Sequence, residues 1–135
     1  MSFREKSAWA MGVVMLVTGL FYAAMVLAMP RAPLLGPLIP YVLAVIVLSI
    51  VTQAVLGIAS PREANAPADE RETVAIDRAG HWSGNALGLG VATALILYVS
   101  GVEITLVMHG IMATLIVSTV VEYALQIWFF RRGTA

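Results

Sequence analysis

The sequence contains no cysteine, and only 12% of its 135 residues are charged. Without cysteine, the chain has neither a disulfide framework nor a thiolate metal site. Its eight basic and eight acidic residues cancel, so there is no basic excess to hold nucleic acid, and we expect no direct binding of DNA or RNA. The chain also lacks a phosphate-binding loop, a Ser-His-Asp set, an HExxH zinc motif and a paired-carboxylate arrangement. These absences predict a protein that is not an enzyme and that holds no cofactor.

Apolar residues, in contrast, make up 60% of the chain. A soluble domain contains about 45–50% apolar and about 25% charged residues. One small core cannot hide so much apolar surface, so the composition indicates that a lipid bilayer is the solvent. Membrane lipid is therefore the first partner that we expect.

Four long apolar runs lie along the sequence, at residues 8–28, 39–59, 84–102 and 105–130. About 20 apolar residues cross a hydrocarbon core of roughly 30 Å. The runs are continuous and do not alternate, which favours helices over strands. The first run is longer than the roughly 7–15 apolar residues of a secretory signal, so we expect it to span the membrane uncleaved. The sequence thus predicts one all-α domain, a four-helix transmembrane bundle over residues 1–135.

Lys and Arg predict the orientation of this bundle. Four spans put both termini and the 60–82 loop on one side of the membrane. Seven basic residues fall on that side, namely Arg4, Lys6, Arg62, Arg71, Arg78, Arg131 and Arg132, and only Arg31 falls on the other. Basic residues collect on the cytoplasmic side of membrane proteins. We therefore expect a multi-pass protein of the bacterial inner membrane with both termini in the cytoplasm.

The 60–82 loop is the only substantial polar segment. Its first half contains two prolines and is typical of an extended linker. Asp69 and Glu72 then form the pattern of a capping box, which predicts either a short helix or an extension of the third span. The loop is either a solvated connector or a docking site for a cytoplasmic protein partner. The partner-binding residues expected in the second case are Asp69, Glu70, Arg71, Glu72 and Arg78.

Short motifs resemble those of a group of small bacterial four-helix membrane proteins without an established activity. They are "FREKSAW", "DERETVAIDRAGHWSG" and the terminal "VVEYALQIWFFRRG". The group carries a cytoplasmic Asp-Glu-Arg-acidic motif, a glutamate in the last span and an aromatic-Arg-Arg-Gly ending. The matching positions are Asp69, Glu70, Arg71, Glu72, Ile76, Glu122, Phe130, Arg131, Arg132 and Gly133, with Phe130 where the group usually has tyrosine. Some similar proteins are encoded beside helix-turn-helix regulators, so the resemblance implies a role with a partner.

Glu122 is an unusual carboxylate, because it lies within the last apolar run, nine residues before Arg131. At 1.5 Å per residue it lies about 13 Å along the helix from that arginine. Such a group should face protein and be hydrogen-bonded or protonated. The same depth count predicts an intramembrane polar layer of Gln53, Asn85, Ser118, Glu122 and Gln126. This layer fixes helix register, handles protons or cations, or contacts a subunit or partner, or else Glu122 reaches the membrane interface.

His109 and two glycines are further residues of interest in the spans. His109 falls near the predicted level of Tyr22, Tyr41 and Tyr98, so we expect it to be hydrogen-bonded to a neighbour. A lone histidine is a weak metal signal, and we expect no metal site. Gly84 and Gly88 match a small-xxx-small pattern, which predicts close helix packing at these positions.

These features favour a non-catalytic inner-membrane scaffold or signalling protein that acts through its cytoplasmic loop. The alternative is a homo-oligomeric proton or cation channel or transporter that uses Glu122. Four helices are few for a pore in a single chain, so the alternative requires oligomerisation.

Overall fold

Helices account for most of residues 1–133, the part of the chain that the computed structural model describes. The elements are α1 (Phe3–Ala28), α2 (Leu35–Ala59), the one-turn α3 (Pro61–Ala64), α4 (Glu70–Val99) and α5 (Ile104–Arg132). Within these described residues there is no strand. Each of α1, α2, α4 and α5 is long and apolar enough to cross a membrane. The prediction of an all-α protein with four long apolar helices is confirmed.

Local sequence explains where the helices begin and end. The Ser2 side chain caps α1 by accepting a hydrogen bond from the Glu5 N–H at 3.2 Å, which satisfies a donor that has no partner within the helix. The turn after α4 contains Gly101 at φ +91°, a conformation that glycine adopts without steric penalty. The last turn of α5 holds Arg131 and Arg132, whose positive charges interact favourably with the helix dipole.

The helices α1, α2 and α4 all begin before the predicted spans, α1 at Phe3 and not at residue 8. The second helix begins at Leu35 and not at residue 39. Pro37 lies in its first turn, where a proline loses no helical hydrogen bond, and Pro40 lies inside the helix. The larger difference concerns the predicted 60–82 loop. There α4 already begins at Glu70 and continues for 30 residues, so only α3 and a short linker separate it from α2. Of the two expectations for this segment, an extension of the third span is the one observed.

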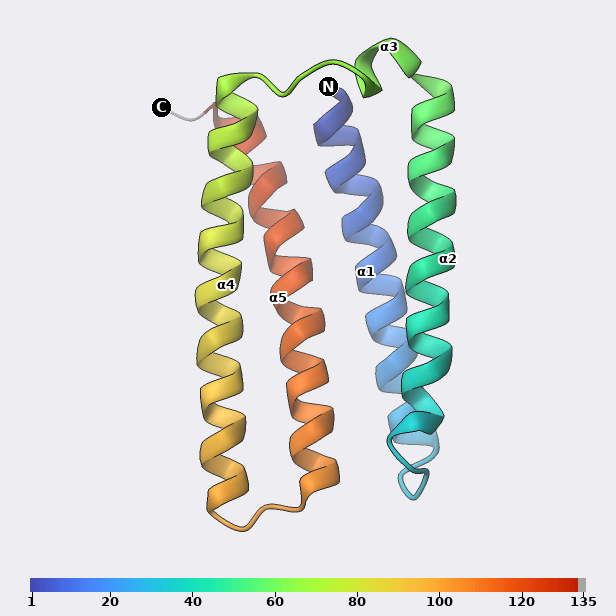
Figure 1. The fold of residues 1–135 in the computed structure, drawn as a ribbon, viewed down its shortest axis with the longest axis vertical. Coiled ribbons are helices and arrows are strands. Elements are labelled where there is room, and N and C mark those ends of the chain that lie inside the picture. The colour runs from blue at the N-terminus through green and yellow to red at the C-terminus, as the bar shows by residue number, and fades with distance from the viewer. Residues whose placement is uncertain (134–135) are drawn as a thin grey trace.

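The long helices lie side by side in the order α4, α5, α1, α2 (Figure 1). Packing joins α4 to α5, α5 to α1 and α1 to α2, so α1 and α5 are central while α2 and α4 lie at the two outer edges. The start of α1, the end of α5, α3 and the linker before α4 all lie at the same end of the bundle (Figure 1). We call this the charged end, because it carries Arg4, Lys6, Glu63, Glu72 and Arg131.

Small side chains form much of the buried face of α4. On α4 the buried residues include Ala75, Ala79 and Ser83, each four residues from the next. Residues at this spacing share one helical face, and small side chains let helices approach closely in membranes. Further along α4, a Cβ built on Gly90 would overlap the Thr114 side chain of α5.

Gly84 and Gly88 do not pack closely against another helix of the chain, although they match a close-packing pattern. A Cβ built at either position would meet no atom within 4 Å, because both glycines lie on an exposed side of α4. The small-xxx-small pattern occurs on α4, but it is shifted to the helical face that Ala75, Ala79 and Ser83 share.

Large apolar side chains remain mostly on the outside. Val13, Leu20, Ile50 and Ile96, for example, are all more than half exposed. A buried cluster of Tyr22, Tyr41 and Ile116 joins α1, α2 and α5. An apolar exterior around a small interior is the arrangement that a lipid solvent favours, because the hydrophobic effect does not drive helices together there.

Candidate functional site

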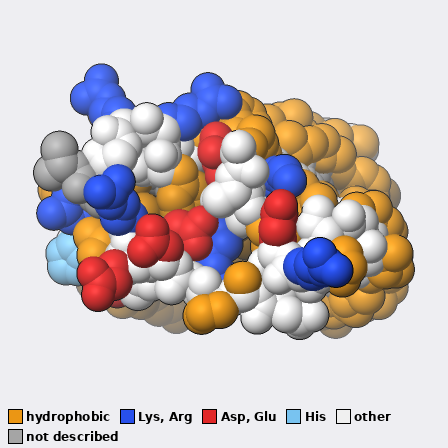
Figure 2. Space-filling model, turned by 90° about the horizontal axis from the view of Figure 1, so that it is seen from above, with side chains coloured by type: hydrophobic (Ala, Val, Ile, Leu, Met, Phe, Trp, Pro, Cys, Tyr) orange, Lys and Arg blue, Asp and Glu red, His pale blue; other side chains and the backbone are white. Residues whose placement is uncertain are grey.

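Ion pairs tie separate elements together at the charged end. Arg4 of α1 lies 3.7 Å from the Glu72 carboxylate of α4, and Lys6 lies 3.4 Å from Glu63 of α3. Arg131 of α5 donates from Nε to Glu5 of α1 at 3.3 Å. Viewed onto this end, basic and acidic side chains gather over the helix ends, and most of the visible apolar side chains lie to the right of them (Figure 2). The N-terminal turns of α1 therefore connect to α3, α4 and α5.

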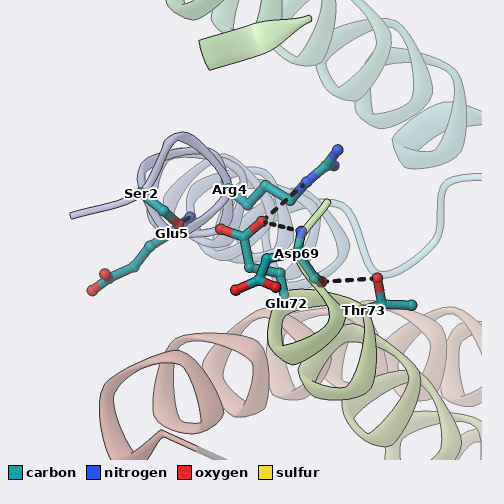
Figure 3. A network of polar contacts seen from close by, with 6 residues as sticks. All are labelled: Ser2, Arg4, Glu5, Asp69, Glu72 and Thr73. Carbon is teal, nitrogen blue, oxygen red and sulfur yellow. Dashed lines mark hydrogen bonds and ion pairs between the residues drawn. The ribbon is translucent and has the colours of Figure 1, made fainter. Parts of the chain in front are cut away.

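The first turn of α4 is fixed by a capping box, as the sequence predicts. The Asp69 N–H donates to Glu72 Oε2 at 3.2 Å, and Thr73 Oγ1 donates to the Asp69 carbonyl at 3.1 Å. Figure 3 shows that Arg4 approaches the same Glu72 carboxylate from α1. Asp69 and Glu72, two of the five predicted partner-binding residues, are thus engaged in holding the start of α4.

The remaining charged side chains of this segment point outward. Glu70, Arg71, Asp77 and Arg78 are all exposed, and none of them takes part in the ion pairs found within residues 1–133. Positions three or four apart lie on one side of a helix, so Arg71 and Arg78, two turns apart, share a face with Val74 between them. We call Glu70, Arg71, Val74, Asp77 and Arg78 the outer face of α4.

Glu122 lies between α4 and α5, and both of its carboxylate oxygens accept hydrogen bonds. Ser83 Oγ donates to Oε2 at 3.2 Å, and Gln126 Nε2 donates to Oε1 at 3.2 Å. The Ser83 hydroxyl also approaches the Gly80 carbonyl at 3.1 Å. Ser83 and Gln126 are both buried. The carboxylate therefore has hydrogen-bond donors from two helices.

The other members of the predicted polar layer do not meet Glu122. Gln53 of α2 donates from Nε2 to Ser7 Oγ of α1 at 2.9 Å, Asn85 is exposed and pairs with His81 on its own helix at 3.3 Å, and Ser118 donates to the Leu115 carbonyl. The depth count gives the level of a residue along a helix, but it does not give the direction in which the side chain points. The predicted layer of five thus resolves into a Ser83–Glu122–Gln126 cluster, a separate Ser7–Gln53 pair, and two residues bonded within their own helices.

Ser83 is the member of this cluster that the sequence reasoning missed. Its four-residue spacing from Ala79 and Ala75 was the available signal, because it indicated that all three side chains lie on one packed face of α4.

His109 pairs with Tyr22, one of the three tyrosines at its predicted level. The Tyr22 hydroxyl and His109 Nδ1 share a hydrogen bond of 2.7 Å between α1 and α5. Tyr41 packs edge-on against the Tyr22 ring with centroids 5.2 Å apart, whereas Tyr98 is exposed. Among residues 1–133, no group of three or more His, Cys, Asp or Glu side chains could hold a metal ion. The His109 imidazole is therefore hydrogen-bonded to the Tyr22 hydroxyl, beside a mainly apolar cluster.

Comparisons of the chain with protein-family models, with curated proteins and with solved structures found no match. The resemblance to small bacterial four-helix membrane proteins stays a prediction.

Proposed function

We propose that this protein is a non-catalytic scaffold or signalling protein of the bacterial inner membrane that binds a cytoplasmic protein partner through the outer face of α4. The observation that carries the proposal is the division of charge at the start of α4. Asp69 and Glu72 hold the helix in place through the capping box and Arg4. Glu70, Arg71, Asp77 and Arg78 are exposed beside them.

The length of α4 supports a docking role. A helix of 30 residues is about 45 Å long, whereas the hydrocarbon core of a bilayer is roughly 30 Å thick. The difference leaves about three helical turns outside the hydrocarbon, which matches the charged segment from Glu70 to Arg78. Because this segment is already helical and capped, a partner would not have to order it, and pre-ordered surfaces bind at lower entropic cost.

The proposed orientation puts the charged end in the cytoplasm. Seven of the eight Lys and Arg residues belong to the segments at this end, and Arg31 belongs to the opposite one. This asymmetry supports cytoplasmic termini through the positive-inside tendency. A periplasm-active reporter fused to the C-terminus should therefore be silent in cells, and an active fusion would refute the orientation.

A charge-reversal experiment tests the partner proposal. We expect Arg71→Glu combined with Arg78→Glu to abolish co-purification of a cross-linked cytoplasmic protein, because like charges across an interface are repulsive. Arg62→Glu is the matched control, since Arg62 is also an exposed arginine but belongs to α3 and not to the outer face of α4. Recovery of the same partner with the double variant and with the control would contradict the proposal.

The alternative proposal is a homo-oligomeric proton or cation channel or transporter. It rests on the Glu122 carboxylate, which lies between two helices with a hydrogen bond to each oxygen. Reconstituted wild-type protein that carries no ion across liposome membranes at any pH would exclude this alternative.

A further inference from the structure

An apolar groove runs along the side of the molecule that α1 and α5 form together. It consists of two open cavities of about 290 Å³ and about 150 Å³. Tyr22 is among the residues that line the larger cavity, and Trp9 is among those that line the smaller one. Leu16 and Val120 line both cavities. No residue of α2 or α4 lines either cavity. The two cavities therefore form one groove that follows α1 from Trp9 to Tyr22.

The groove is long, and its walls offer almost no hydrogen-bonding group. From Trp9 to Tyr22 the helix rises about 20 Å at 1.5 Å per residue. One leaflet is about half of the roughly 30 Å hydrocarbon core, so the groove is longer than a leaflet is deep. Apart from Trp9 and Tyr22, its walls are aliphatic side chains and glycines. A ligand in this groove must present a long apolar chain.

Arg131 lies at the charged end of this groove, beside Trp9, and Arg132 is the next residue of α5, beside Trp128, which lines neither cavity. The Arg131 guanidinium lies 5.4 Å from the centre of the Trp9 ring, and that of Arg132 lies 4.7 Å from the centre of the Trp128 ring. Arg131 follows the groove-lining Ile127 by four residues and therefore continues the same face of α5. Glu5 binds Arg131 through Nε alone. A guanidinium has five N–H donors, so further donors remain for a second anion.

From this arrangement we infer that the groove binds an anionic phospholipid, with an acyl chain along α1 and α5 and the phosphate headgroup at Arg131 and Arg132. The apolar walls match the chain, and the arginines match the phosphate, because basic residues at the end of transmembrane helices bind anionic headgroups. Arg131 and Arg132 contribute two positive charges and Glu5 contributes one negative charge, so a net positive charge remains for the phosphate.

Charge also favours a lipid over a second copy of the chain. A second copy inserted in the same orientation would bring its own Arg131 and Arg132 to the same end of the groove. Like charges brought together in this way repel, whereas a phosphate neutralises them. The inference adds a ligand site to the proposed membrane scaffold and does not depend on a protein partner.

Native mass spectrometry can test this site. The protein is reconstituted into vesicles of equal parts phosphatidylglycerol and phosphatidylcholine with the same acyl chains, then released in mild detergent, and the bound lipids are counted. We expect wild-type protein to retain phosphatidylglycerol over phosphatidylcholine. Each basic residue near a lipid surface contributes about fivefold in affinity. Arg131→Gln with Arg132→Gln should therefore weaken retention of phosphatidylglycerol by roughly thirtyfold.

Matched variants separate the groove from the rest of the surface. Ala124→Phe fills the smaller cavity, which Ala124 lines, and it should abolish retention. Ala92→Phe adds the same ring to an exposed site on α4 and should leave retention unchanged, as should Arg62→Gln.

Equal retention of the two lipids by wild-type protein would overturn the inference, and so would unchanged retention by Ala124→Phe. A protein dimer that forms without phosphatidylglycerol and that Ala124→Phe dissociates would overturn it in favour of a second copy. If Ala124→Phe does not fold, the retention of phosphatidylglycerol by the variant with Arg131→Gln and Arg132→Gln still tests the inference.

Discussion

Gly90 provides a direct test of how α4 packs on α5. A Cβ added to Gly90 would lie 2.9 Å from Thr114 Oγ1 and 3.0 Å from Thr114 Cβ, and it would overlap Thr114 Cγ2. Thr114 cannot rotate away freely, because its Oγ1 donates to the Gly110 carbonyl at 2.9 Å. We therefore expect Gly90→Ala to push the two helices apart or to break that hydrogen bond.

The expected magnitude follows from two opposing effects. Extra volume in a packed contact destabilises by about 1–3 kcal/mol, while alanine in a helix interior is favoured over glycine by about 0.8–1 kcal/mol. Gly88→Ala is the matched control, because an added Cβ there meets nothing within 4 Å and only the second effect operates. The helix-propensity gain cancels in the comparison. Gly90→Ala should thus be less stable than Gly88→Ala by about 1–3 kcal/mol.

Denaturation of the purified protein can measure this difference. Folded protein in a mild detergent is titrated with sodium dodecyl sulfate, and tryptophan fluorescence gives the free energy of unfolding for each variant. Wild-type protein and Gly84→Ala, another open position, complete the series. If Gly90→Ala and Gly88→Ala proved equally stable, the close α4–α5 contact at Thr114 would be refuted.

Two further predictions concern the polar contacts between helices. Glu122→Gln should change the free energy of unfolding little, since an amide can bond both Ser83 and Gln126, whereas Glu122→Leu should lower it by about 1–3 kcal/mol because buried Gln126 loses its partner. Equal stabilities of these two variants would contradict the hydrogen-bonded role, and loss of ion flux in Glu122→Gln liposomes would favour transport. Tyr22→Phe should destabilise by about 1–3 kcal/mol, because it leaves the His109 nitrogen without its partner while the contact with Tyr41 stays. A double-mutant cycle with His109→Phe checks this pair, and additive effects would refute the hydrogen bond.

The helices were predictable from sequence because their cause is local. Each long apolar run must form its backbone hydrogen bonds internally in lipid, so length and composition alone indicate α1, α2, α4 and α5. The capping box at Asp69 and Glu72 is also local, because all of its atoms lie within four residues. Only the boundaries shifted, as at the start of α2, where Pro37 lies in the first helical turn and Pro40 lies inside the helix.

The helix neighbours were not predictable in the same way. The count of residues along each helix placed Gln53, Asn85 and Glu122 at the same depth. However, α2 packs on α1, and its Gln53 is hydrogen-bonded to Ser7 of α1. Asn85 follows Ser83 by two residues, so it points about 160° away from the helical face that meets Glu122. The face of α4 could have been found from the spacing of Ala75, Ala79 and Ser83, which are buried together. The more conspicuous Gly84 and Gly88 were misleading because glycine composition alone does not identify a contact face.

Glu122 is the residue on which the two proposed functions differ, and its depth favours the partner proposal. Its carboxylate contacts Ser83, and the neighbouring Trp82 is 62% exposed. Trp9 and Trp128 are exposed as well, next to Arg131 and Arg132. Tryptophan prefers the boundary between membrane and water, so a boundary through these three rings would leave Glu122 within about two helical turns of the headgroups. The penalty for an acidic side chain there is well below the roughly 2.5–3.5 kcal/mol that applies at the helix centre. Two hydrogen bonds then account for the carboxylate without an ion path. Because Ser83 belongs to the same helix as Arg71 and Arg78, Glu122 fixes the base of the segment that carries the outer face of α4.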